Sequence, residues 1–179
     1  MTRYVALLRG IAPTNPNMRN DKLRAVFEGL GFENVKTVIS SGNVVFESPS
    51  RSRKKLEETI ERALPEQLGF RSTTIVRSRA QLQQLVDKNP FEGLEHSQKT
   101  SLNVTFLRRR ISTAIKSTSR VEDWDDQILG LYGDTICSMI DLTSGRTPDL
   151  MLKLEKKFGR EITTRTWKTV EKILQTMGK

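Results

Sequence analysis

Arginines that stand where strands and helices begin or end are the residues of this sequence best suited to chemistry. Arg9 and Gly10 follow a β-rich apolar run, and a Ser/Gly/Asn cluster separates two further β-rich runs. An arginine, hydroxyl groups, an amide and the free backbone N–H groups of a turn can together hold a phosphate or a carboxylate. The sequence therefore indicates an anion site, made of Arg9, Gly10, Ser40, Ser41, Gly42 and Asn43. The alternative is ordinary turn chemistry beside a solvated strand end.

A second candidate anion site stands near the C-terminus. We expect the last helix to run from about Thr164 to Met177, so that its first N–H groups and its dipole favour an anion. Arg165 adds positive charge beside Thr164. The alternatives are a threonine that only caps the helix and a tryptophan, Trp167, that belongs to the core.

Other charged clusters favour solvated surface over a site. The run Arg108–Arg110 ends a predicted strand and is able to grip phosphates, but Asp134 in the facing turn favours a solvated charge run. The acidic residues Asp123, Asp125 and Asp126 crowd one loop without the spacing of a calcium site.

The residues that common enzymes use are scarce. The chain has one histidine and one cysteine, so neither a disulfide within the chain nor a Cys/His metal cluster is expected. His96 stands in a polar linker, and Cys137 stands among apolar residues of a predicted strand, as a buried structural thiol would. The sequence therefore predicts no metal, no cofactor and no catalytic residue that can be named.

Composition and charge favour a soluble protein with anionic partners. Of 179 residues, 36% are hydrophobic and 28% are charged, and the formal net charge is +9. Both ends are basic, with a net +6 over residues 1–80 and +5 over 151–179, whereas residues 81–150 carry a net −2. Such a balance fits polyanion binding, nucleic acid included, and it also fits solvated basic faces. No run approaches the roughly 20 apolar residues of a membrane span, so we expect a cytoplasmic protein without a membrane partner. The sequence does not indicate an oligomeric state.

The spacing of apolar residues in the first half predicts the order β-α-β-β-α-β. A strand over residues 3–9 precedes a helix over 21–30, a hairpin over 35–46, a helix over 51–64 ended by Pro65 and Gly69, and a strand over 70–76. A capping box from Ser78 to Gln81 opens a further helix. In this split βαβ pattern the first and third strands are neighbours, which brings Arg9 and Gly10 to the turn at residues 40–43.

The second half repeats the pattern without repeating the sequence. A strand over 101–107, a weak helix over 111–119, a hairpin over 127–140 and a helix from Thr147 are followed by the last helix. We therefore expect an α+β fold of two ferredoxin-like lobes with antiparallel sheets, the second with an extra C-terminal helix. The expected domains are residues 1–90 and 91–179.

Three blocks resemble the domain of unknown function 1697 family of small, mostly bacterial proteins. They are Tyr4–Ile11, Ser41–Phe46, and Thr164–Trp167 with Thr169-Val170, so the resemblance runs from Met1 to about Leu174. It implies a two-lobed α+β fold and no particular activity, and it marks Arg9, Gly10, Ser41, Gly42, Asn43, Thr164, Arg165 and Trp167. This chain departs from the family at Ala12–Asn17, where a Gly-rich loop is usual, and at Thr166, where Asn is usual.

Two functions follow as hypotheses. The first is a non-catalytic module that binds an anionic ligand or nucleic acid through arginines at sheet edges and helix N-termini. The alternative is a small-molecule enzyme that acts on a phosphorylated or carboxylated substrate in the cleft between the lobes.

Overall fold

A computed structural model of the protein describes residues 1–109, 125–143 and 147–178. The chain divides into two compact units. The first unit comprises residues 1–84 together with 171–179, and the second comprises residues 85–170. The C-terminal residues therefore group with the first unit, although they follow the second along the chain.

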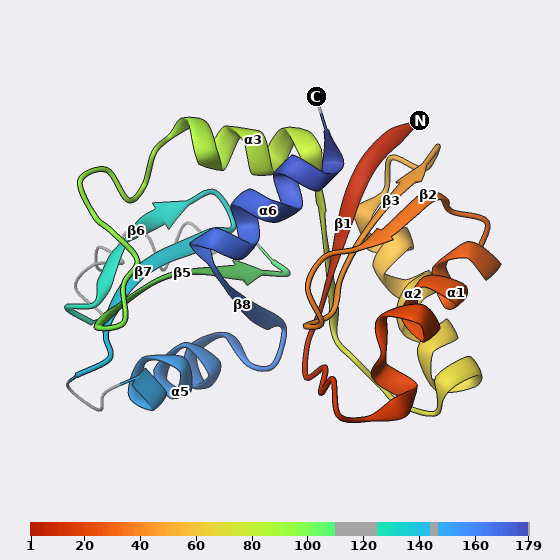
Figure 1. Ribbon diagram of the computed structural model, residues 1–179, viewed down its shortest axis with the longest axis horizontal. Coiled ribbons are helices and arrows are strands. Elements are labelled where there is room, and N and C mark those ends of the chain that lie inside the picture. Colours follow the sequence, from red (N-terminus) through yellow and green to blue (C-terminus); the bar gives the residue numbers. More distant parts are fainter. Residues whose placement is uncertain (110–124, 144–146, 179) are drawn as a thin grey trace. The chain divides into compact units, whose positions relative to one another are not determined.

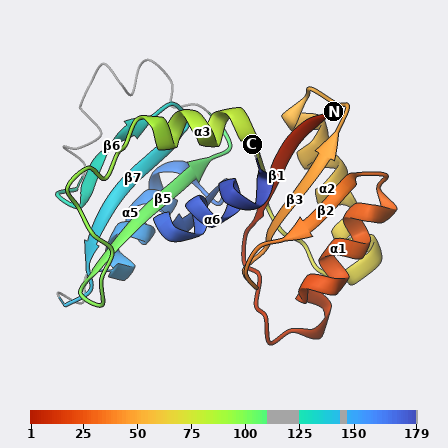
Figure 2. The ribbon, with the colours of Figure 1, turned by 45° about the horizontal axis from the view of Figure 1, so that its top comes forward.

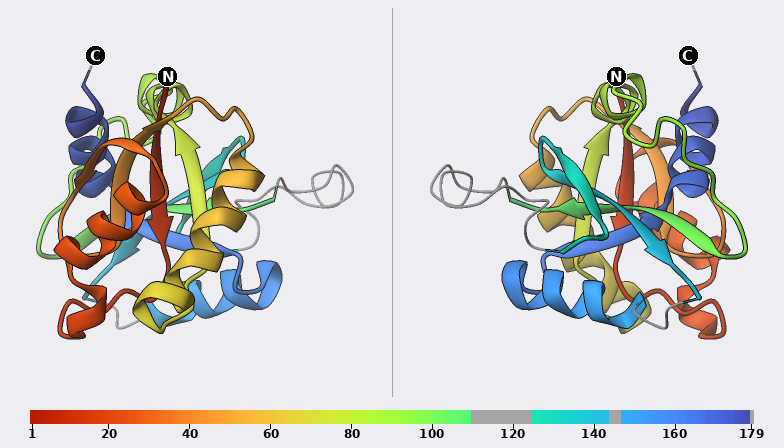
Figure 3. Two further views of the ribbon diagram at one scale, coloured as in Figure 1. Left: turned by 90° about the vertical axis from the view of Figure 1, so that its right-hand side faces the viewer. Right: turned by 90° about the vertical axis from the view of Figure 1, so that its left-hand side faces the viewer.

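The first unit is built on a four-stranded antiparallel sheet in the order β2-β3-β1-β4. Helices α1 and α2 lie on the same face of this sheet (Figures 1 and 3). This is the ferredoxin-like split βαβ arrangement that the sequence predicted. Along the chain the elements are β1 (Thr2–Leu8), the 3-10 turn η1 (Pro16–Met18), α1 (Asn20–Gly29), β2 (Glu33–Thr37), β3 (Asn43–Ser48), α2 (Arg53–Leu68), β4 (Thr74–Ser78) and α3 (Arg79–Asp87).

Alternation along the strands assigns the apolar side chains of this sheet to its two faces. Tyr4, Ala6 and Leu8 of β1 belong to the core beneath the two helices, where Phe27 of α1 and Phe46 of β3 meet edge to face. The opposite face is also buried, and its members include Val5, Leu7, Val45, Ile75 and Arg77. Because both faces are buried, β1 is apolar from Tyr4 to Leu8, and four successive residues of β4, from Thr74 to Arg77, are buried without alternation.

The second unit repeats this sheet in the order β6-β7-β5-β8, again antiparallel throughout. Helix α5 lies on one face of the sheet (Figure 2). Its residues Leu150 and Leu154 join a core cluster with Leu107, Ile136 and Ile140. The helix expected over residues 111–119 lies outside the described residues. The elements from here on are β5 (Thr100–Leu107), β6 (Ile128–Tyr132), β7 (Thr135–Asp141), α5 (Thr147–Phe158), β8 (Ile162–Thr166) and α6 (Trp167–Met177). Helix α6 begins in the second unit, and its residues from Glu171 onward belong to the first.

Two predicted helix boundaries were wrong. Helix α2 continues through Pro65 to Leu68 and ends at Gly69, whose φ of 75° and N–H bond to the carbonyl of Pro65 form the cap. A proline one turn from the end removes few of the helix's hydrogen bonds, and the burial of Leu64 favours the continuation. The last helix begins at Trp167 rather than Thr164, because Ile162–Thr166 pairs with β5 as a strand.

The capping box before α3 is confirmed. The Ser78 backbone N–H donates to Gln81 Oε1 at 3.0 Å, and the Gln81 N–H donates to Ser78 Oγ at 3.3 Å. Helix α6 follows β8 in the same way that α3 follows β4. In the part of the chain that the structure describes, the helices are too short or too polar to cross a membrane.

Candidate functional site

The end of β1 and the turn between β2 and β3 meet at one edge of the first sheet. The Leu8 backbone N–H donates to the carbonyl of Gly42 at 2.8 Å, and the Arg9 N–H donates to the carbonyl of Thr73 at 2.9 Å. Ser72 Oγ donates to the carbonyl of Arg9 at 2.8 Å. Arg9 and Gly10 are therefore fixed between the turn at residues 40–42 and the segment that leads into β4, as the split βαβ order requires.

Gly42 makes this close approach of β1 and the turn possible. Its φ is 78°, and a Cβ at this position would stand 2.5 Å from Ile11 Cγ1 and 3.1 Å from Leu8 Cβ. Both the backbone conformation and the space at Gly42 therefore exclude a side chain. The glycine serves the packing of the site and presents no side chain to a ligand.

Asn43 also acts on the turn. Its side chain is 1% exposed, and Nδ2 donates to the carbonyl of Val38 and to Ser41 Oγ, both at 2.9 Å. The amide therefore closes the turn from inside, while Ser40 and Gly10 are exposed and Ser41 is half-buried. Of the predicted site, these residues and the half-buried Arg9 are the ones that a ligand can reach.

Ile39 is a residue of this edge that sequence reasoning missed. It has a φ of 57°, which β-branched residues rarely adopt, and its side chain is 44% exposed. A strained, exposed isoleucine directly before Ser40 and Ser41 presents an apolar group beside two hydroxyls. Its sequence context carries no signal for this conformation, because isoleucine usually indicates extended, buried backbone.

The second sheet contains an equivalent edge with a different charge balance. The Leu107 N–H donates to the carbonyl of Asp134 at 2.9 Å, and the Arg108 N–H donates to the carbonyl of Glu161 at 3.0 Å. The Glu161 carboxylate pairs with Arg108 Nη1 at 3.7 Å and with Arg109 Nε at 3.2 Å. Two arginines of this edge are thus matched by a carboxylate of the same unit, and Arg110 lies outside the described residues.

The two edges differ in the residue whose carbonyl accepts from the arginine after the central strand. Arg9 and Arg108 hold the same position after the central strand, and Thr73 holds the position of Glu161. The carboxylate of the second edge is therefore replaced by a hydroxyl at the equivalent position of the first. The exposed Arg71 precedes this segment and adds a further positive charge to that stretch of chain.

Thr164 and Arg165, predicted to stand at a helix N-terminus, lie instead within β8 of the second unit. Thr164 Oγ1 bonds Thr105 Oγ1 across the sheet at 2.8 Å. Arg165 Nη1 donates to Thr163 Oγ1 at 2.8 Å and to the carbonyl of Thr164 at 2.9 Å. Burial lowers the pKa of Arg165 to about 10. The prediction that a helix dipole acts at these two residues was therefore wrong.

The cap of α6 is Thr166, whose Oγ1 accepts from the Thr169 N–H at 3.4 Å.

The remaining candidates have structural surroundings. Cys137 is fully buried, and burial raises the pKa of its thiol to about 12. His96 Nδ1 accepts the Leu102 N–H at 3.3 Å, which ties the linker to β5. Asp125 pairs with Lys153 at 2.5 Å, while Asp123 lies outside the described residues. Across the described ranges, His, Cys, Asp and Glu side chains form no group of three that could hold a metal ion.

Comparison with known proteins gives a fold and a family. A solved structure described as conserved bacterial protein SP0830 from Streptococcus pneumoniae has a similar fold, with a TM-score of 0.70 over 100% of this chain and 99% of that one at 24% sequence identity. No curated protein matches the sequence. The profile of the family described as protein of unknown function (DUF1697) matches residues 1–136. The match includes Arg9, the turn at residues 40–43 and β5, and it ends before β8. The chain belongs to the DUF1697 family.

Proposed function

We propose that the protein is a non-catalytic module that binds an anionic group at the edge formed by Arg9, Gly10 and the turn at Ser40–Gly42. The observation that carries the proposal is the difference between the two equivalent edges. Glu161 pairs with the arginines of the second edge, whereas the first edge has Thr73 at that position. At that position the first edge carries a hydroxyl where the second carries a carboxylate, and its arginine, hydroxyls and backbone groups favour a phosphate or carboxylate ligand.

The arrangement of the turn supports the same function. Asn43 and Gly42 fix the turn from inside, so that the exposed hydroxyl of Ser40 and the backbone around Gly10 are presented in one conformation. A fixed set of donors loses little conformational freedom when it binds. The formal charge of +9 favours a polyanion such as a nucleic acid, because basic surface raises the local concentration of anions.

Fluorescence anisotropy with labelled single-stranded RNA and duplex DNA, measured from low to physiological salt, tests the proposal. Arg9→Ala is compared with Lys54→Ala, which removes the same charge from an exposed position at the start of α2. We expect Arg9→Ala to weaken binding about tenfold and to reduce the salt slope by about 1. Lys54→Ala is expected to change the affinity and the salt slope by much less than Arg9→Ala does.

A competition experiment identifies which chemical group of the nucleic acid binds at this edge. Inorganic phosphate, titrated into the protein–RNA mixture at constant ionic strength, is expected to displace the probe more effectively than chloride does. If Arg9→Ala and Lys54→Ala weaken binding equally, the charge acts as a diffuse field and the proposed site is wrong.

A further inference from the structure

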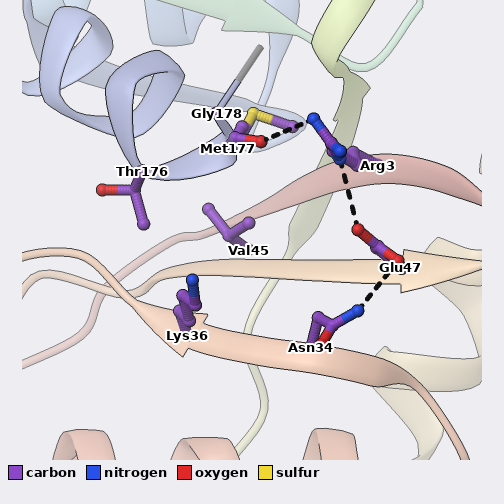
Figure 4. A pocket seen from close by; sticks show the side chains of 8 residues that line it. All are labelled: Arg3, Asn34, Lys36, Val45, Glu47, Thr176, Met177 and Gly178. Atoms are coloured by element: carbon purple, nitrogen blue, oxygen red, sulfur yellow. Dashed lines mark hydrogen bonds and ion pairs between the residues drawn. The ribbon is translucent and has the colours of Figure 1, made fainter.

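A cavity of about 220 Å³ lies near the beginning of β1, on the face of the first sheet opposite helices α1 and α2. It is lined by side chains of β1, β2 and β3 and by the last turn of α6, all within the first unit (Figure 4). Its volume suits a ligand of amino-acid size, since it is smaller than the sites of drug-sized molecules. Arg9 and the turn at residues 40–42 are absent from its lining, so the cavity is separate from the proposed anion site.

One side of the cavity holds the carboxylate of Glu47, which is paired with the guanidinium of Arg3. Glu47 accepts Arg3 Nε at Oε1, 3.2 Å away, and Asn34 Nδ2 at Oε2, 3.0 Å away. The hydrogen bond from Asn34, together with Arg3, lowers the pKa of Glu47, so its carboxylate is ionised at neutral pH. Each oxygen keeps a lone pair for a further donor. The carbonyl of Met177, at the C-terminal end of α6, lies on the same side and accepts a hydrogen bond from Arg3 Nη1 at 3.1 Å.

The other side carries the ammonium group of Lys36. Lys36 faces Val45 across the β2–β3 ladder, and Glu47 is two residues further along β3 on the same face. Such diagonal neighbours are roughly 7–8 Å apart, too far for a short direct contact between Cβ atoms and near enough for one small ligand to touch both. Within the described part of the chain Lys36 has no ion-pair partner, whereas Arg3 is held by Glu47 and the Met177 carbonyl.

Between the two charged sides the lining is apolar. Val45 and Met177 are both buried, and Figure 4 shows Val45 between Lys36 and the end of α6. The cavity therefore presents a carboxylate, an ammonium group and an aliphatic surface to one small volume. A ligand that matches all three carries an ammonium group, a carboxylate and an aliphatic part.

We propose that this cavity binds a small zwitterion of the amino-acid class. The ligand's ammonium group donates to Glu47, its carboxylate pairs with Lys36, and its aliphatic side chain packs on Val45 and Met177. Arg3 and Asn34 act as positioning residues, because they hold the Glu47 carboxylate ionised and in place.

The test compares three probes by saturation-transfer NMR and titration. L-leucine carries both charges, 3-methylbutylamine lacks the carboxylate, and 4-methylpentanoate lacks the ammonium group. We expect leucine to bind more tightly than either single-charge probe by about tenfold, the effect of one charge-assisted hydrogen bond. Lys36→Met is expected to reduce leucine affinity about tenfold and to leave that of the amine unchanged.

Lys22→Met is the matched control, because it removes an exposed lysine from α1, on the opposite face of the sheet. Glu47→Gln is the reciprocal variant, and its folding is checked by thermal unfolding because Glu47 also pairs with Arg3. Equal affinity of leucine and 4-methylpentanoate, an unchanged leucine affinity in Lys36→Met, or the absence of saturation transfer from wild-type protein to leucine would each overturn the proposal. Retention of nucleic-acid binding by Lys36→Met separates this site from the one at Arg9.

Discussion

Arg77 and Arg165 occupy equivalent positions in the two units. Each is the fourth residue of the last strand of its sheet, and each faces a valine of the central strand, Val5 in one unit and Val104 in the other. Each also donates through Nη1 to the carbonyl of the residue before it, at 2.9 Å. The repeat, which is weak in sequence, therefore extends to the hydrogen bonds of single side chains.

The first prediction is that these arginines stabilise the fold and do not bind the anion. Arg165→Ala removes the hydrogen bonds that this side chain donates to Thr163 Oγ1 and to the carbonyl of Thr164. We expect the free energy of unfolding to fall by about 2 kcal/mol, measured by urea denaturation. RNA affinity is expected to change no more than it does in Lys54→Ala. An Arg165→Ala protein that is as stable as wild type but no longer binds RNA would contradict this prediction.

The order of the strands could be predicted from the sequence, and it accounts for the first edge. Apolar alternation in Tyr4–Leu8 and the hairpin signal at Ser40–Asn43 define two strands, and the split βαβ order makes those strands neighbours. The contact between the end of β1 and that turn, made by the Leu8 N–H and the Gly42 carbonyl, follows from topology alone. Local pattern and topology agree here, which is why the predicted strand order is confirmed.

The last strand could not be predicted, because its pattern suits two structures. Thr163–Thr166 is rich in β-branched residues, which favour a strand. Threonine is also a preferred N-cap residue, so the same segment is equally compatible with the start of a helix. Its assignment to β8 depends on pairing with β5, which lies far away in the sequence. The position of Glu161 beside Arg108 depends on the same long-range pairing, and so does the contrast with Thr73.

The second prediction concerns the space at Gly42. Gly42→Ala places a Cβ 2.5 Å from Ile11 Cγ1, in a backbone with φ of 78°. Gly31 has the same φ of 78°, but a Cβ there would have no atom within 4 Å, so Gly31→Ala isolates the backbone effect. We expect Gly31→Ala to reduce the free energy of unfolding by about 1 kcal/mol and Gly42→Ala by at least about 2 kcal/mol. Equal losses, measured by urea denaturation, would show that Ile11 moves aside without cost.

The third prediction concerns the strained backbone at Ile39. Replacement by asparagine, which adopts positive φ more readily, is expected to stabilise the protein by about 1 kcal/mol in urea denaturation. If Ile39 serves the neighbouring anion site, Ile39→Asn also weakens RNA binding in the anisotropy assay. A more stable variant with unchanged affinity would assign Ile39 no part in binding, and a less stable variant would show that its φ is held by favourable contacts.

The last prediction is a pH dependence that arises from Asp125. Burial raises the pKa of this carboxyl, but the hydrogen bonds from Lys153 and from Gln127 outweigh burial and lower the pKa from 3.8 to about 2. A carboxyl whose pKa is lower in the folded state stabilises the protein above its unfolded pKa and loses that effect as the pH falls toward 2. We expect Asp125→Asn to reduce the free energy of unfolding by about 1–2 kcal/mol at pH 7. The effect is limited because Lys153 is partly exposed and solvent screens its charge.

The difference between wild type and Asp125→Asn is expected to shrink between about pH 4 and pH 2, as followed by urea denaturation at each pH. Lys153→Met serves as the control, because it removes the 2.5 Å partner and leaves the carboxyl in its buried place. Burial then acts with less opposition, so the pKa of Asp125 rises toward its unfolded value and the loss of stability on acidification becomes smaller than in wild type. A difference between wild type and Asp125→Asn that stays constant from pH 7 to pH 2 would assign the stabilisation to hydrogen bonding alone, without a contribution from the charge.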